Sequence, residues 1–85
     1  MTVKLVYFAW VREKIGLDEE ELALPEQVKT GADLIAYLTE LGENYAEALQ
    51  FPNAIRIAVN QEHVEHDESL TGAREIGLFP PMTGG

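Results

Sequence analysis

The sequence predicts an α+β fold of two layers, a mixed β-sheet with one main helix packed on one face. Two patterns support this fold class. Apolar residues recur at every second position in segments near both ends of the chain, and one central segment has the three- and four-residue spacing of an amphipathic helix. The segments come in the order strand, strand, helix, strands, without internal repeats. The 85 residues suffice for a single small domain.

Two strands are predicted before the main helix. The first covers residues 2–10, and because both of its faces carry apolar side chains, we expect it at the centre of the sheet. Residues 11–16 are predicted to form a helical turn that ends at the glycine. The second strand is predicted over residues 21–24, with Leu22 and Leu24 pointing inward.

The main helix is predicted to begin at Thr30. Thr30 and Asp33 have the spacing of a capping box, in which the hydroxyl and the carboxylate bind free backbone N–H groups. An apolar stripe at helical spacing then runs to Leu41, and Gly42 is predicted to end the helix. A short second helix is predicted around residues 45–49.

Three strands are predicted in the second half of the chain, over residues 55–59, 62–66 and 75–79. Asn60 and Gln61 form a tight turn between the first two of them, since Asn tolerates a positive φ. The first and last strands of the chain would lie side by side at the centre of the sheet, as in ubiquitin-like β-grasp domains. This placement of the two strands rests on analogy with that fold.

The composition excludes several classes of function. Fifteen acidic residues against six Lys and Arg give a formal net charge of −9, which excludes nucleic-acid binding, argues against an anionic membrane surface and favours a partner with a basic patch. The absence of cysteine excludes disulfides, thiolate metal sites and cysteine nucleophiles, and it fits the cytoplasm. No membrane-spanning apolar run and no secretory signal are expected.

The usual motifs of catalysis and metal binding are missing. No glycine-rich phosphate loop is present, and Ser69, the only serine, lacks the spacing of a nucleophile elbow. His63 and His66 are three positions apart and would lie on opposite faces of a strand, so we expect no metal site. Arg12 and Glu13 are interpreted as an ion pair or as the surface of the helical turn. We therefore expect no autonomous active site.

The C-terminal segment is predicted to be a flexible tail. We place the domain at residues 1–79 and the tail at residues 80–85, because Pro80-Pro81 favours an extended backbone that holds the following residues away from the domain. A frayed chain end is the alternative interpretation.

The terminal glycine is the predicted site of chemistry. Gly84 and Gly85 have no Cβ, so they can thread a narrow slot in a partner that reaches the terminal carbonyl carbon. A carboxylate is a poor electrophile, so another protein would first have to adenylate Gly85 with ATP. A sulfur nucleophile could then convert it to a thiocarboxylate.

Phe79 is the second candidate position. If Ile76 and Leu78 face the helix, Phe79 faces solvent at the root of the tail and would be a binding anchor. Alternatively, a twist or a bulge turns it into the core. Phe8 would widen the same patch if the terminal strands pair, and His63 would lie on its rim.

Three segments resemble the small, sulfur-carrying subunit of molybdopterin synthase. Residues 7–16 look like that family's first strand and turn, residues 58–61 match a strand and turn, and residues 78–85, Leu-Phe-Pro-Pro-Met-Thr-Gly-Gly, resemble its C-terminal signature. The chain departs from the family at Ala73-Arg74, where Gly-Asp often stands.

The resemblance implies a ubiquitin-like β-grasp fold. It also implies that a ubiquitin-E1-like enzyme uses ATP to adenylate Gly85, that a sulfur-donating enzyme makes the thiocarboxylate, and that the tail enters a large subunit in a heterotetramer of two small and two large subunits. The sulfur then passes to precursor Z, a cyclic pyranopterin monophosphate, to build the molybdopterin dithiolene. No permanently bound cofactor is implied. The same likeness assigns partner contacts to Phe79, Pro80, Pro81, Met82, Thr83 and Gly84.

Two alternatives stay open at this point. A related carrier would deliver sulfur to thiamin or tRNA, or would be conjugated to protein lysines. A β-grasp adaptor would bind its partner without any covalent step at Gly85.

Overall fold

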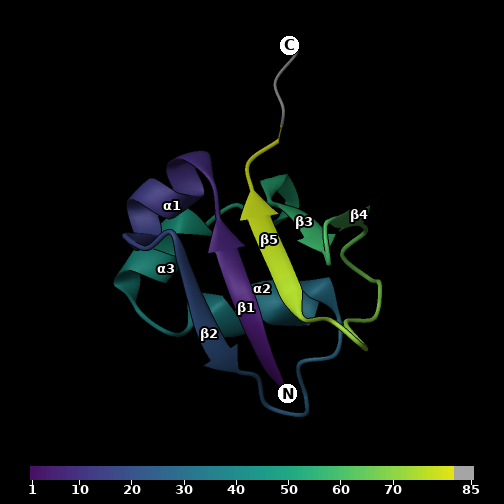
Figure 1. The fold of residues 1–85 in the computed structure, drawn as a ribbon. Coiled ribbons are helices and arrows are strands. Elements are labelled where there is room, and N and C mark those ends of the chain that lie inside the picture. Colours follow the sequence, from purple (N-terminus) through teal and green to yellow (C-terminus); the bar gives the residue numbers. More distant parts are fainter. Residues whose placement is uncertain (82–85) are drawn as a thin grey trace.

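A computed structural model describes residues 1–81, which form two layers, a mixed sheet and the helices packed on one of its faces (Figure 1). The strands lie in the order β2-β1-β5-β3-β4. Both findings confirm the predicted α+β fold. The elements in chain order are β1 (Thr2–Tyr7), α1 (Ala9–Ile15), β2 (Glu19–Ala23), α2 (Gly31–Thr39), α3 (Glu43–Ala48), the 3₁₀-helix η1 (Pro52–Ala54), β3 (Arg56–Val59), β4 (Glu62–Val64) and β5 (Glu75–Phe79).

The first and last strands pair at the centre of the sheet, as predicted. β1 and β5 are parallel, with Leu5 opposite Ile76 and Tyr7 opposite Leu78. Parallel strands end at the same edge of a sheet, so the segments that follow β1 and β5 emerge together (Figure 1). Residues 8 and 79, far apart in sequence, become neighbours for this reason.

The first strand is shorter than predicted. It ends at Tyr7 and not at residue 10, because Ala9 has a φ of +52° and turns the chain into α1. This positive φ is rare for a residue with a Cβ. Helix α1 ends as predicted at Gly16, whose φ of 91° is left-handed and whose N–H donates to the carbonyl of Arg12 at 2.8 Å.

The capping box of α2 is confirmed. Thr30 Oγ1 accepts the N–H of Asp33 at 3.2 Å, and Asp33 Oδ2 accepts the N–H groups of Lys29 and Thr30, each at 3.1 Å. These hydrogen bonds from the backbone, first that of Lys29 and then that of Thr30, lower the pKa of the Asp33 carboxyl. The network satisfies N–H groups that the first turn of a helix leaves free.

The predicted end of the main helix is wrong. α2 ends at Thr39, Leu41 is 40% exposed, and Gly42 stands before α3 instead of closing α2. The N–H of Glu40 donates to the carbonyl of Tyr37 at 3.1 Å, a 3₁₀ contact that tightens the last turn and ends the α-helix early.

The ends of β2 and β4 also differ from prediction. β2 runs over Glu19–Ala23 and not 21–24, although Leu22 packs against the core and Leu24 is buried, as expected. β4 ends at Val64 and not at residue 66, because the chain turns so that the ring Nε2 of His66 lies 2.6 Å from the carbonyl oxygen of Ile55.

The predicted turn at Asn60 and Gln61 is confirmed, with φ values of 50° and 71°. The side chain of Asn60 also holds the segment that leads into β5. Its Oδ1 accepts the N–H groups of Arg74 at 2.9 Å and Glu75 at 3.1 Å, and its Nδ2 donates to the carbonyl of Gly72 at 3.3 Å. Gly72 supplies the positive φ of this loop, 81°, ahead of the unusual Ala73-Arg74 pair.

The core lies between the inner face of the sheet and the helices. None of the buried residues among 1–81 is charged, and nearly all have purely apolar side chains. Burial of apolar area in this layer is the main source of stability for so small a domain. The largest side chains within it are Tyr7, Leu5, Leu34, Leu38, Leu49, Ile55, Ile57, Leu70, Ile76, Leu78, Val3 and Val11.

One carboxylate accepts hydrogen bonds from two tyrosine hydroxyls beside the core. Glu20 Oε2 accepts the hydroxyls of Tyr7 at 2.7 Å and Tyr45 at 2.6 Å, which ties β1, β2 and α3 together. Burial, followed by the hydrogen bond to Glu20, raises the pKa of Tyr7 strongly and raises the pKa of Tyr45 to about 12. Both phenols therefore stay protonated donors at neutral pH.

Candidate functional site

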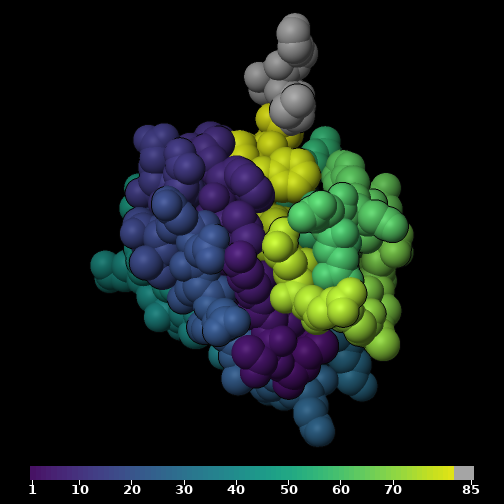
Figure 2. All heavy atoms as spheres, in the orientation of Figure 1, coloured from purple at the N-terminus to yellow at the C-terminus, as the bar shows by residue number. Residues whose placement is uncertain are grey.

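The outer face of the sheet carries a band of small side chains. Gly77 of β5 lies opposite Val6 of β1 on one side and opposite Ala58 of β3 on the other. Figure 2 shows this face, on which β1 and β5 are open to view and no helix lies in front of them. The sheet is therefore covered on one side only.

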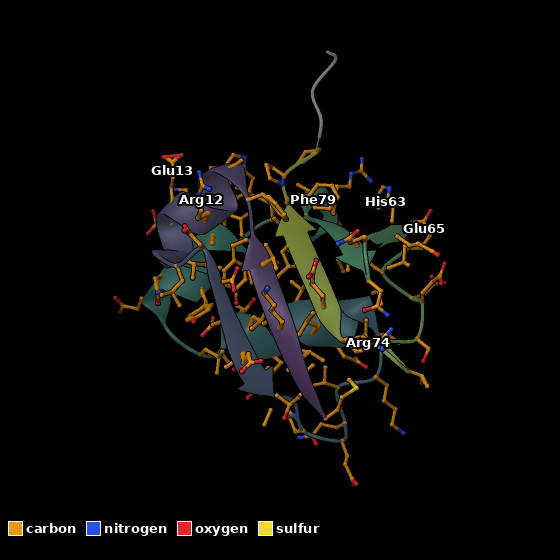
Figure 3. The ribbon with its side chains drawn as sticks, in the orientation of Figure 1. Arg12, Glu13, His63, Glu65, Arg74 and Phe79 are labelled. Carbon is orange, nitrogen blue, oxygen red and sulfur yellow. The ribbon has the colours of Figure 1, made fainter. Side chains whose placement is uncertain are left out.

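Aromatic rings stand at one end of this band. The ring of Phe79 lies 6.3 Å from that of Phe8 in an edge-to-face arrangement, and 5.9 Å from the imidazole of His63. Figure 3 places Phe79 at the end of β5 with His63 beside it. Phe79 is half-buried on the outer face, so the alternative that it turns into the core is wrong, and Phe8 widens the patch as predicted.

A glycine leaves room beside these rings. A Cβ on Gly77 would lie 3.2 Å from Cε2 of Phe8, closer than side chains normally approach. Because Gly77 has no side chain, the space beside the Phe8 ring stays open, and this space is part of a hollow of about 600 Å³. We call this hollow the aromatic hollow, and it is lined by Phe8, Ala9, Ala58, Gln61, Glu75, Gly77, Phe79, Pro80 and Pro81.

The sequence predicted only part of this surface. The structure brings together Phe8, His63, Phe79, Pro80 and Pro81, all predicted contacts, whereas the predicted positions 82–85 (Met82, Thr83, Gly84 and Gly85) lie outside the described residues.

Two small residues of the aromatic hollow, Ala9 and Ala58, were missed, because only the pairing of β5 with β1 and β3 brings them beside Phe79. The place of Gly77 follows from alternation within β5, since residues 77 and 79 share a face.

The other candidate positions form neither the suggested ion pair nor a metal-binding cluster within residues 1–81. Arg12 and Glu13, labelled in Figure 3, are both exposed on α1. Arg12 lies 3.8 Å from the carboxylate of Asp18 and forms no ion pair with Glu13, so the two are surface residues of the helical turn. Among residues 1–81, no three side chains of His, Asp or Glu are placed to hold a metal ion. Within the same residues no helix has the length and apolar character needed to cross a membrane.

Comparison with known proteins finds relatives along nearly the whole chain. Residues 5–85 match the ThiS family. The chain is 36% identical over 83 residues to the molybdopterin synthase sulfur carrier subunit of Escherichia coli K12, covering 98% of this chain and 99% of that protein.

Solved structures share the fold. The putative molybdopterin converting factor subunit 1 of Pyrococcus furiosus has 32% identity and a TM-score of 0.74, covering 96% of this chain and 99% of that chain. A structure from Helicobacter pylori, described as the complex of subunits 1 and 2 of molybdopterin-converting factor, has 23% identity and a TM-score of 0.63 over the full length of both chains. The chain thus belongs to the ThiS family and has a ubiquitin-like β-grasp fold.

Proposed function

We propose that this chain is the sulfur-donor subunit of molybdopterin synthase. The supporting observation is that its likeness to the E. coli sulfur carrier subunit spans 98% of the chain, and that the family match extends to Gly85. The aromatic hollow at the root of the terminal segment, residues 80–85, supplies the surface on which a partner would dock. Gly85 would be the reacting residue.

The proposed chemistry takes place at one carbon atom. An adenylating enzyme joins the α-carboxylate of Gly85 to the α-phosphate of ATP, and pyrophosphate leaves. Sulfur released by a sulfur-donating enzyme as hydrosulfide would then attack the carbonyl carbon, the bond to AMP would break, and a thiocarboxylate would remain. ATP is thus a substrate of the activating enzyme and not a cofactor of this chain. Because the chain has no cysteine, the terminus is the one position at which it could carry sulfur covalently.

The large subunit would complete the site. It would hold precursor Z and accept the tail, in an assembly of two small and two large subunits, and the H. pylori complex of subunits 1 and 2 supports such a partner. A dithiolene contains two sulfur atoms and each tail carries one, so each product consumes two loaded chains. Attack of the thiocarboxylate sulfur on precursor Z would leave a thioester, and hydrolysis of its acyl–sulfur bond by water would return Gly85 to a carboxylate, ready for another cycle in the cytoplasm.

The folded domain would serve to deliver the tail. Phe79 and Phe8 offer an apolar anchor, and Pro80-Pro81, which line the aromatic hollow, fix the backbone where the tail leaves the domain. A partner that covers the hollow would thereby hold the tail at a defined starting point. This arrangement favours entry of a narrow Gly-Gly end into a buried pocket.

The test is reconstitution with defined components. The chain is purified from its native host and its intact mass is measured by mass spectrometry. Molecules that carry the thiocarboxylate should be heavier than the free carboxylate form by the mass difference between one sulfur atom and one oxygen atom. Loaded chain mixed with the large subunit and precursor Z should yield the dithiolene product, and a chain lacking Gly85 should yield none. If the loaded chain gives no dithiolene, the assignment fails. If the purified chain never carries sulfur, the alternative is favoured in which it is a β-grasp adaptor that binds its partner without a covalent step at Gly85.

A further inference from the structure

One arginine on the outer face has no acidic partner. Arg56 lies directly opposite Phe79 in the antiparallel pairing of β3 and β5, so both side chains emerge from the same face. It is exposed, and within residues 1–81 it makes no ion pair. By contrast, Lys4, Arg12 and Lys14 lie 3.3, 3.8 and 3.1 Å from carboxylates of this chain.

The surroundings of Arg56 are polar and open. Arg56 and His63 line a second hollow of about 430 Å³, together with the acidic residues Glu65 and Asp67. Neither acid forms an ion pair with Arg56. His63 packs on Phe79, which lines the aromatic hollow, so the two hollows are adjacent.

Three basic residues make no ion pair within residues 1–81, namely Lys29, Arg56 and Arg74, and of these Arg56 is the one opposite Phe79, in a chain with a net charge of −9. The chain as a whole repels acidic surfaces, so a carboxylate of a partner is accepted only where a local positive charge receives it. Arginine suits this role because its planar fork of N–H donors binds a carboxylate with two parallel hydrogen bonds. Such a pair fixes the orientation of docking as well as its strength.

We propose that Arg56 pairs with a carboxylate of the large subunit, next to an apolar side chain of that subunit that enters the aromatic hollow. The proposal rests on the proposed function for the identity of the partner. Three features of this chain support it: Arg56 lies beside Phe79, it has no ion pair among the described residues, and its surface is continuous with the root of the tail. Arg56 thus determines which partner surface fits.

The test compares two arginines that undergo the same charge change. Arg74 is also exposed and without an ion pair within residues 1–81, but it precedes β5 at the end opposite Phe79 (Figure 3). The dissociation constant for the purified large subunit is measured by calorimetry for the unchanged chain, Arg56→Glu, Arg56→Gln, Arg74→Glu and Phe79→Ala, at low and high NaCl. Thermal unfolding of each variant checks that it is folded.

Arg56→Glu should weaken binding about tenfold or more at low salt, and Arg74→Glu by less than about twofold. Added NaCl should raise the dissociation constant of the unchanged chain for the large subunit by a larger factor than that of Arg56→Gln. A large-subunit Asp or Glu replaced by Lys should restore binding to Arg56→Glu.

Two results would overturn the proposal in different ways. If Arg56→Glu and Arg74→Glu bind alike while Phe79→Ala binds weakly, the aromatic surface docks but Arg56 is not recognised. If the unchanged chain does not bind the large subunit, the proposed function fails, and the role of Arg56 fails with it.

Discussion

The two faces of the sheet differ sharply although they are built from the same strands. On β5, Ile76 and Leu78 point inward and are fully buried, whereas Gly77 and Phe79 point outward beside the aromatic hollow. The inner face packs against α2 and holds the fold together. The outer face is left uncovered and carries the candidate docking surface (Figure 2). A strand with a period of two can therefore serve stability with one set of residues and recognition with the other.

This division means that stability and binding should respond to different substitutions. Substitutions on the inner face should lower the free energy of unfolding and leave the affinity for the large subunit unchanged. Substitutions on the outer face should lower that affinity and leave the free energy of unfolding nearly unchanged. Substitutions on the two faces therefore test this difference from both sides.

Leu34→Ala should have the largest effect. Leu34 of α2 is fully buried, so its truncation removes apolar contacts and leaves a cavity, at a cost of about 3 kcal/mol in the free energy of unfolding. Urea unfolding measures this loss. Affinity for the large subunit, measured well below the midpoint of thermal unfolding, should stay within a factor of about two. A large loss of affinity in folded protein would mean that the helical face also binds.

Phe79→Ala should show the reverse pattern. Loss of a central aromatic anchor should weaken binding to the large subunit by about 2 kcal/mol or more. Because Phe79 is half-buried and outside the core cluster, the free energy of unfolding should fall by less than about 1 kcal/mol. Calorimetric titration and urea unfolding give the two values. A variant that unfolds at room temperature would instead place Phe79 among the residues that hold the fold.

Glu20→Ala should cost about 1–2 kcal/mol in the free energy of unfolding, since it leaves the buried Tyr7 hydroxyl without its acceptor. Glu21→Ala is the matched control, because Glu21 is the next residue of β2 and is exposed. It should change the same free energy by less than about 0.5 kcal/mol. Equal effects from the two variants would show that the tyrosine contacts do not stabilise the fold.

Asp33→Asn should have the smallest effect, and one that depends on pH. The backbone N–H groups of Lys29 and Thr30 lower the pKa of Asp33 in the folded chain, so its carboxylate stabilises the fold above the ordinary pKa of about 3.9. That contribution is lost as the pH falls through the lowered pKa. The difference in thermal midpoint between wild type and Asp33→Asn should therefore shrink from pH 7 towards pH 2. A difference that does not change with pH would contradict this cause.

Local signals predicted the fold well where local interactions decide the structure. The capping box at Thr30 and Asp33, the turn at Asn60 and the bounds of β5 all depend on residues close in sequence, and the structure has each of them. The outward position of Phe79 remained open from the sequence, because twist and bulges depend on the neighbouring strands.

Features set by distant contacts were missed. Ala9 adopts a positive φ that alanine does not favour alone, and Phe8 at that bend packs against Phe79 from the other end of the chain. Glu20 meets two tyrosines, 13 and 25 positions away along the chain. The aromatic hollow likewise exists only after β1, β5 and β3 have paired.

Cross-saturation NMR with labelled alanine methyl groups compares the two faces most directly. Ala9 and Ala58 line the aromatic hollow, whereas Ala32 and Ala36 are exposed on α2. With the large subunit bound and irradiated, the signals of Ala9 and Ala58 should lose intensity and those of Ala32 and Ala36 should not. Loss at Ala32 and Ala36, with Ala9 and Ala58 unaffected, would show that the partner binds the helical layer and would contradict docking on the outer face.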